Sequence, residues 1–306
     1  HFDDVSVVEY VADRRRTVID LAARALLQHD RQLKVIAANL EKKIKSELAK
    51  MLKDEREAYE TFWKNFGRQL KYGVVGDYGA HKELLQDLLL FWSSTEKKPV
   101  TLEEYVSRMK EDQKVIYYAA GDSVDKIDRL PQLEALKDQG IEILYFTEEV
   151  DEFVAQTLRS YKDKEFRSAM DGVAEAEDLE KAKEAADAHE DVFTFVKDTL
   201  GDAVAEVKPS ARLKSHPVCL SAGEGVSFEM EKYFQAMQPD SGIKAQRILE
   251  LNTEHPAFTA LENAVTADPE KAKIYAKLLY DQALLIAGLP LDDPSGYTDL
   301  VCGLMK

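Results

Sequence analysis

Cysteine is scarce in this sequence of 306 residues, which contains only Cys219 and Cys302, far apart in the chain. This pattern cannot form the dense disulfide framework of small secreted proteins, and it favours a reducing compartment. The sequence also lacks an apolar run long enough to cross a membrane, and its N-terminus lacks the hydrophobic core of a signal peptide. We therefore expect a cytoplasmic protein without a membrane partner.

Positive charge is also in deficit, because 41 lysine and arginine residues face 57 aspartate and glutamate residues. The formal net charge of −16 repels phosphate backbones and predicts no nucleic-acid partner. The 6 histidines are scattered without cysteine or carboxylate neighbours at the spacing of metal ligands, which predicts no metal site. With 45% hydrophobic residues, the chain is long enough for two domains with cores of their own.

Glycine and proline are absent from the first 66 residues, which are rich in good helix formers. One helix of that length would extend for about 100 Å, so we expect two or three helices with breaks near Asp30 and Asp54. Glycines return between Gly67 and Gly79, which predicts an irregular region. Leucines at helical spacing then predict a helix from Lys82 to about Trp92.

Residues 101–123 form the most informative stretch and predict a helix followed by a strand. Thr101 and Glu104 have the spacing of a capping box at the helix start. The apolar run Val115–Ala120 has the length and composition of a strand that is buried on both faces. Gly-Asp-Ser at 121–123 then ends the strand and caps the next helix.

Helix and strand signals continue to alternate up to residue 170, which predicts a small α/β unit with a mainly parallel sheet. The expected helices cover Ser123–Arg129, Pro131–Asp138 and a segment that Thr147 caps, and the expected strands cover Ile141–Phe146 and Phe166–Met170.

Residues 172–191 are strongly acidic and almost without large apolar side chains, so we interpret them as a solvated linker or an exposed helix start, and as the domain boundary. Beyond them, strand and helix signals mix, which predicts an α+β domain that ends in two consecutive helices. The expected helices cover 192–200, 227–237, 256–266, 269–287 and 297–305, and strands cover 204–208, 218–221 and, unless it is a frayed helix, 244–251.

Several residue strings resemble one protein family. The string EYVSRMKEDQKVIYYAAG at 104–121 closely resembles the middle-domain signature of the ninety-kilodalton heat-shock chaperones, of the bacterial HtpG type. Farther along, KSHPVCLSAGEGVSFEMEKYFQAM and RILELNTEHPAF resemble the C-terminal domain of that family, and LLYDQALLIAGLPLDDP resembles its dimerisation helices. The resemblance extends from about Leu26 to Met305, with the motifs in the order of the family.

The resemblance implies a two-domain α/β and α+β organisation. Residues 26–171 correspond to the small middle subdomain with its helical N-terminal segment, 172–191 to the acidic linker, and 192–306 to the C-terminal dimerisation domain. Residues 1–25 fit the family poorly, and we interpret them as a divergent helical start, either native or engineered. The sequence has no Gly-rich phosphate loop and no Walker-type lysine motif, so we expect the family's ATP-binding domain to be absent from it.

The family resemblance implies a chaperone of the heat-shock stress response that binds unfolded or partly folded client proteins and forms a homodimer. The full-length family is an ATP-dependent clamp with weak ATPase activity that uses ATP and Mg²⁺, whereas we expect no cofactor and no enzymatic activity in this chain alone. Arg24 and Gln28 match family positions that contact ATP, where a guanidinium suits the γ-phosphate oxygens. The alternative is that Arg24 is a solvated helix residue without a role.

The helix that Ser227 is expected to cap carries four apolar residues at helical spacing: Met230, Tyr233, Phe234 and Met237. Spacing alone favours a core stripe. The resemblance instead implies contact with clients, and flexible thioethers and aromatic rings suit a surface that accepts many sequences. Both interpretations stay open here, as does a weaker client role for Trp92, whose large side chain is by default a core residue.

The last two expected helices carry apolar faces that a chain end rarely buries alone, so packing against the helices of a partner is physically reasonable. The resemblance implies an isologous four-helix bundle with two helices from each protomer. The residues expected at this dimer interface are Ile274, Leu278, Leu279, Leu285, Leu300, Val301 and Leu304.

Two other classes of function remain to be compared with a chaperone. One is an enzyme with a small doubly wound domain, which a pocket with convergent titratable groups would favour. The other is an engineered or structural dimerisation scaffold without client activity.

Overall fold

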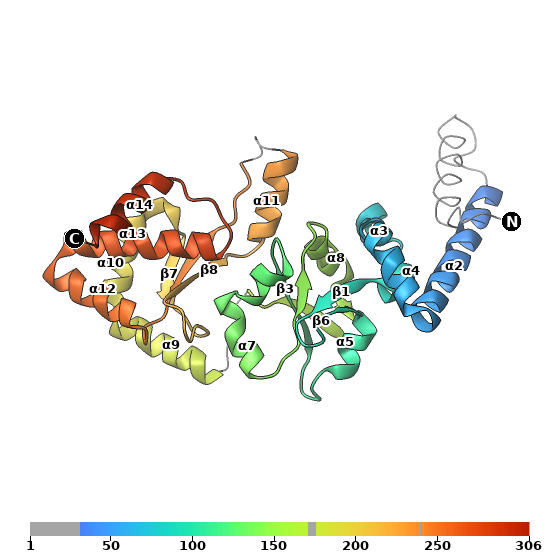
Figure 1. The fold of residues 1–306 in the computed structure, drawn as a ribbon, viewed down its shortest axis with the longest axis horizontal. Helices are drawn as coiled ribbons and strands as arrows, with labels where there is room; N and C mark the ends of the chain where they lie inside the picture. The colour runs from blue at the N-terminus through green and yellow to red at the C-terminus, as the bar shows by residue number, and fades with distance from the viewer. Residues whose placement is uncertain (1–30, 171–175, 239, 241, 306) are drawn as a thin grey trace. The chain divides into compact units, whose positions relative to one another are not determined.

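Two long helices open the part of the chain that the structure describes (Figure 1). The structure is a computed structural model and describes residues 31–170, 176–238, 240 and 242–305. The chain divides into two compact units, residues 1–64 and 65–306. Helix α2 covers Arg31–Asp54 and helix α3 covers Arg56–Val75.

The ends of these helices test the predictions for the helical start. The break after Asp54 is confirmed, whereas the predicted break near Asp30 lies outside the described residues. The irregular region predicted over Gly67–Gly79 was wrong in its first part, because α3 continues through two glycines to Val75. It was right for the turn 76–79, where Asp77 and Tyr78 have positive φ. A Cβ atom on Gly73 would lie 2.9 Å from Cδ1 of Leu85, so this glycine permits close packing of the helix rather than a turn.

A six-stranded mixed sheet forms the first half of the second unit, in the order β2-β1-β4-β3-β6-β5. The strands are β1 (Leu90–Ser93), β2 (Pro99–Thr101), β3 (Val115–Ala120), β4 (Leu144–Phe146), β5 (Ser160–Tyr161) and β6 (Lys164–Ser168). Strand β3 is parallel to both neighbours, β4 and β6. The pairs β1–β2, β1–β4 and β5–β6 are antiparallel.

The prediction of a mainly parallel sheet was therefore wrong outside the centre of the sheet. Two local pairings, β1 with β2 and β5 with β6, add antiparallel strands that the alternation of helix and strand signals did not indicate. The helix predicted over 82–92 was also wrong at its end, because α4 (Lys82–Leu85) and a 3₁₀ turn (Gln86–Leu88) give way to β1. A short apolar run such as Leu88–Phe91 has no period that separates helix from strand.

Short helices connect the strands of this sheet, and the caps of two of them were predicted. They are α5 (Leu102–Arg108), α6 (Val124–Asp128), α7 (Glu134–Asp138) and α8 (Asp151–Leu158). Thr101 and Glu104 form the predicted capping box, and Ser123 caps α6. Thr147 does not cap α8, because this helix begins only at Asp151 and Val150 occupies the N-cap position.

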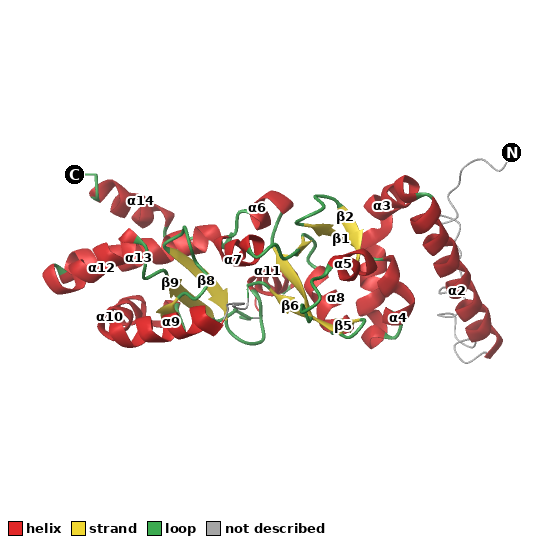
Figure 2. Cartoon of the chain, turned by 90° about the horizontal axis from the view of Figure 1, so that it is seen from below, coloured by secondary structure: helices red, strands yellow, loops and turns green. Residues whose placement is uncertain are grey.

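A three-stranded sheet with the order β7-β9-β8 forms the second half of this unit (Figure 2). Its strands are β7 (Glu206–Pro209), β8 (Val218–Ala222) and β9 (Arg247–Leu251), with β7 parallel and β8 antiparallel to β9. The helices of this half are α9 (Ala176–Ala188), α10 (Glu190–Leu200), α11 (Phe228–Met237), α12 (Pro256–Ala267), α13 (Pro269–Ile286) and α14 (Pro294–Gly303).

Helices α10, α12 and α13 pack with this sheet around one apolar core, which includes Val196, Leu249, Leu261 and Leu279. The acidic segment at the predicted domain boundary is helical over α9. With these helices and the two sheets, the chain is a mixed α/β protein. Among the described residues, no helix is long and apolar enough to cross a membrane.

Candidate functional site

Helix α11 is fixed to the three-stranded sheet by its first turns. The hydroxyl of Ser227 accepts a hydrogen bond from the amide of Met230 at 3.1 Å, as a cap should, and Phe228 enters the apolar core. The buried carboxylate of Glu231 accepts hydrogen bonds from the amide of Ala245 at 2.7 Å and from Nη2 of Arg247 at 2.9 Å. These contacts hold the helix on the segment that leads into β9.

The predicted stripe on α11, which we call the apolar row, is formed by Met230, Tyr233, Phe234 and Met237. Burial decreases along it, because Met230 is 5% exposed, Tyr233 and Phe234 are half-buried, and Met237 is 66% exposed. Met230, Tyr233 and Phe234 are not members of the apolar core around β9, which receives Phe228 from this helix. The row is therefore neither a core stripe nor a fully open surface.

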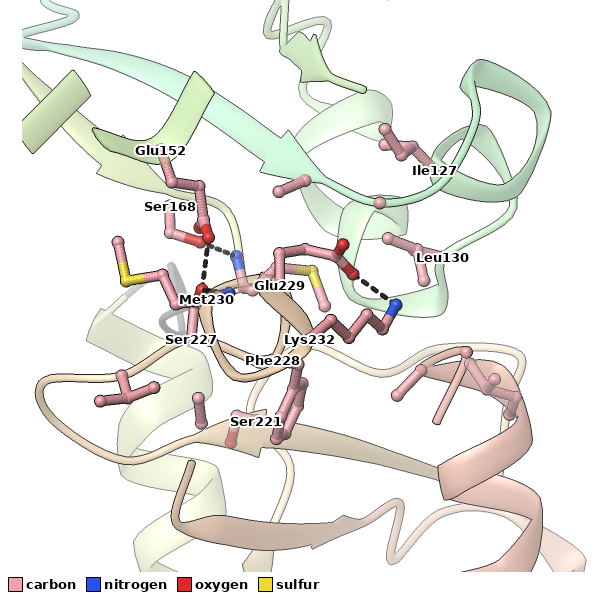
Figure 3. Close-up of a pocket in the computed structure, with 18 of the residues that line it drawn as sticks. Ile127, Leu130, Glu152, Ser168, Ser221, Ser227, Phe228, Glu229, Met230 and Lys232 are labelled. Carbon is pink, nitrogen blue, oxygen red and sulfur yellow. Dashed lines mark hydrogen bonds and ion pairs between the residues drawn. The ribbon is translucent and has the colours of Figure 1, made fainter. Parts of the chain in front are cut away.

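Helix α8 lies against the apolar row. The ring of Phe153 is centred 5.2 Å from the ring of Tyr233 and 6.2 Å from that of Phe234, both in edge-to-face arrangements. The side-chain amide of Gln156 lies 3.6 Å from the sulfur of Met230. At the start of α11, the hydroxyl of Ser227 donates a hydrogen bond to Glu152 (Figure 3).

A charged cluster holds the other side of the same helix. Nζ of Lys232 lies 2.6 Å from a carboxylate oxygen of Glu229 and 3.2 Å from one of Asp122, in the loop after β3. Burial lowers the pKa of Lys232, but hydrogen bonds and charge from Glu229 and Asp122 outweigh it and raise the pKa above its ordinary value. The hydrogen bond from Lys126 and the charge of Lys232 outweigh burial and lower the pKa of Asp122.

A cavity of about 770 Å³ lies beneath α11. Its walls come from the carboxyl ends of β3 and β6, from β8 and from α8 and α11, and include Gly121, Glu152, Ser168, Ser221, Ser227 and Met230 (Figure 3). Several of its charged groups are partnered, since Lys232 pairs with Glu229 and Ser227 donates to Glu152. These contacts position α11 beside the cavity. A serine hydroxyl that donates to a carboxylate, as Ser227 does to Glu152, is not by itself an activated nucleophile, so the cavity does not favour the enzyme alternative.

Trp92 belongs to a different cluster from the apolar row. Its half-buried side chain packs on the core formed by residues such as Tyr117, Ile127 and Leu133, and its indole N–H has no hydrogen-bond partner among the described residues. The structure thus places Trp92 as a partly buried residue of the six-stranded sheet, apart from the apolar row.

The residues predicted at the dimer interface fall into two groups. Leu278 and Leu279 are 5% and 7% exposed, so their own chain already covers them. Leu285 and Leu304 are each 49% exposed, and Ile274, Leu300 and Val301 are half-buried. The apolar surface that α13 and α14 expose therefore lies toward the second group.

Other predicted positions give no site in the structure. Arg24 and Gln28 lie outside the described residues. Within the part of the chain that the structure describes, no group of three or more histidine, cysteine or acidic residues could hold a metal ion. Cys219 is a buried free thiol and Cys302 an exposed one.

Sequence reasoning missed the partners of the apolar row. Phe153 lies in the helix predicted after Thr147, but nothing in the sequence indicated that it contacts the apolar row. Glu152, Gln156 and Asp122 carried no signal either. These contacts join segments more than seventy residues apart, such as Gln156 and Met230. Helical periodicity shows which residues share a face, but it does not show which distant element covers that face.

Comparison with known proteins shows which family this chain matches. The family model described as Hsp90 protein matches residues 21–306. The chain is 51% identical over 306 residues to chaperone protein HtpG of Bacillus subtilis (strain 168), which covers 99% of this chain and 49% of that relative. The identity is 53% over 306 residues for chaperone protein HtpG of Clostridium acetobutylicum and 52% over 305 residues for that of Halalkalibacterium halodurans, with the same shares covered.

The chain spans about half the length of the curated relatives it matches. Because the matches cover 99% of the chain, they include most of the segment 1–25 that we expected to diverge. The extent and order of the match confirm the resemblance seen in the residue strings. The chain therefore belongs to the Hsp90 protein family.

Proposed function

We propose that this chain acts as a molecular chaperone that binds unfolded or partly folded client proteins along the apolar row of α11. The observation that carries the proposal is the partial exposure of a methionine and aromatic row that ends at Met237, 66% exposed. Unbranched thioethers adapt to irregular partners, and aromatic rings provide large contact areas at a small entropic cost. The relatives named chaperone protein HtpG support this class of function.

The chain is further proposed to form a homodimer through α13 and α14. Exposed Leu285 and Leu304 and half-buried Val301 supply the apolar area that two helices at a chain end leave open. In an isologous dimer both copies of the apolar row belong to one assembly, so weak contacts with a long unfolded client reinforce each other. Clients and a second copy of this chain are therefore the proposed partners.

The proposed activity of this chain is the binding of client proteins. Hydrolysis of ATP with Mg²⁺ is proposed only for a longer protein of the family, in which Arg24 and Gln28 would approach the nucleotide. The cytoplasm is the proposed compartment, and two free thiols are compatible with its reducing conditions.

Substitution of Met237 by alanine tests the proposed client surface directly. The probe is fluorescently labelled α-lactalbumin that has been reduced and carboxymethylated, so that it stays unfolded. Because Met237 is largely exposed, the variant should keep its stability, and its dissociation constant for the probe should rise about threefold to tenfold, the effect of removing one apolar contact. Leu179→Ala on α9, which removes another exposed apolar side chain, is the matched control.

Equal affinity of the Met237→Ala variant and the wild type would contradict the client surface proposed here. A dimer that leaves the aggregation of heated client unchanged would instead support the alternative of a dimerisation scaffold. Nothing in the comparisons favours that alternative.

A further inference from the structure

The apolar row of α11 is already in use within its own chain. Phe153 of α8 covers Tyr233 and Phe234 with two edge-to-face ring contacts, centred 5.2 Å and 6.2 Å away. Gln156, one turn farther along α8, reaches the sulfur of Met230. Three of the four residues of the apolar row are thus in contact with α8.

Helix α11 does not need α8 to stay folded on its sheet. Phe228 lies in the apolar core, and Glu231 accepts hydrogen bonds from the amide of Ala245 and the guanidinium of Arg247. These attachments use a different face of the helix from the apolar row. Separation of α8 from α11 would therefore leave the helix in place and expose the row.

The contact between the two helices is also weakly packed. The cavity of about 770 Å³ is lined by Glu152 and Gln156 of α8 together with Ser227 and Met230 at the start of α11. Side chains that border such a space on one side lose part of their dispersion contacts. Contacts of this kind open at a lower cost than a continuous core.

We propose that α8 is an intramolecular latch on the apolar row, and that a client competes with Phe153 for Tyr233 and Phe234. This inference rests on the proposed function, because a latch regulates client binding only if the row binds clients. Only open molecules then bind a client, so the apparent affinity is the intrinsic affinity multiplied by the fraction of molecules that are open.

A second element secures the latched position. Asp122, in the loop after β3, pairs with Lys232 of α11 at 3.2 Å and stands outside the apolar row. The side chain of Asp122 is 42% exposed, so its substitution does not create a defect in the core. Loss of this ion pair should open the latch without removing any proposed client contact.

Phe153→Ala tests the latch with the same labelled, unfolded α-lactalbumin. The variant removes the covering ring and leaves every residue of α11 unchanged, so the probe should bind about threefold or more tightly than it binds to the wild type. Asp122→Asn should shift the affinity in the same direction by a smaller factor. Phe166→Ala, which removes a half-buried ring from β6, is the matched control and should leave the affinity unchanged.

The outcomes separate the latch from the proposed function. If the wild type binds the probe and Met237→Ala weakens it, but Phe153→Ala and Asp122→Asn bind equally or less tightly than the wild type, the latch is refuted and client binding stands. Weaker binding by Phe153→Ala would make its ring part of the client surface. If neither the wild type nor Phe153→Ala binds the probe, the proposed function itself fails. Because Asp122→Asn removes only an exposed charge, it decides the matter even if Phe153→Ala does not fold.

Discussion

Arg212 shows how much a single side chain contributes to the second unit. It is buried in the loop before β8, where Nη2 and Nε bind the carboxylate of Glu250 at 2.9 Å and 3.1 Å. Its Nη1 donates hydrogen bonds to the carbonyl oxygens of Ala169, at 3.1 Å, and Met170, at 2.8 Å. Both residues follow β6 in the chain. One guanidinium therefore connects the end of the six-stranded sheet to the centre of the three-stranded sheet.

Glu250 stays charged in this buried position. Burial raises its pKa, but the charge of Arg212 and hydrogen bonds from Ser221 and Arg212 outweigh burial and lower the pKa below its ordinary value. The Ser221 hydroxyl donates to the carboxylate at 2.7 Å. A buried carboxylate without its cation keeps the desolvation penalty and loses the compensating attraction.

We predict that Arg212→Met reduces the free energy of unfolding by about 3–5 kcal/mol, because it leaves Glu250 buried and unpaired. Urea denaturation followed by circular dichroism measures this change. Lys214→Met is the control, since Lys214 pairs with Asp138 at the surface, where an ion pair contributes about 1 kcal/mol or less. Equal losses in the two variants would show that the buried pair carries no special share of the stability.

Among the elements, helix α5 depends on the capping box at its start. The hydroxyl of Thr101 accepts a hydrogen bond from the amide of Glu104 at 3.1 Å, and the carboxylate of Glu104 accepts one from the amide of Thr101 at 2.7 Å. The helix has only 7 residues, so these two bonds satisfy a large share of its backbone groups.

We predict that Thr101→Ala costs about 1 kcal/mol of unfolding free energy, the usual effect of losing a helix cap. Thermal or urea denaturation detects this loss. The matched control is Thr95→Ala, which changes an exposed threonine in the turn between β1 and β2 and should be neutral. A neutral result for Thr101→Ala would mean that packing of Leu102 and Tyr105 alone holds α5.

The predictable elements of this fold are those with chemical signals in their own few residues. Thr101, Ser123 and Ser227 were recognised as caps because a side-chain hydroxyl accepts a hydrogen bond from the amide three residues away. Strand β1 was missed because its pairing with β2 and β4 decides its conformation, and neither partner is visible in Leu90–Ser93 itself. The cover that α8 places on α11 was missed for the same reason.

The candidate site was predictable in part. The residues of the apolar row and the cap at Ser227 follow from spacing, and the structure confirms the helix they form. Spacing does not reveal that Met230 is buried while Met237 is exposed, since this depends on the position of α8. The dimer residues divide in a similar way, because Leu279 joins a core whose members come from several distant segments.

At the scale of the whole molecule, the proposed homodimer depends on the exposed apolar surface of α13 and α14. We predict that the double variant Leu285→Glu and Leu304→Glu sediments as a monomer at micromolar concentration where the wild type sediments as a dimer. Each substitution occurs twice in a symmetric interface, so the dissociation constant should rise about a hundredfold or more.

The control for this experiment is Leu179→Glu, which places the same charge at an exposed leucine of α9. The position of the substitution matters, since Leu278 is 5% exposed and a charge there would unfold the chain rather than separate two chains. Unchanged sedimentation of the double variant would exclude α13 and α14 as the interface.

The two cysteines differ in a way that is useful for labelling. Cys219 is fully buried in β8, and burial together with the nearby charge of Glu250 raises the pKa of its thiol well above the ordinary value. Cys302 is exposed on α14. A maleimide at neutral pH should therefore attach a single spin label per chain without any engineered cysteine, and the distance between two such labels would report directly on how α14 approaches its counterpart.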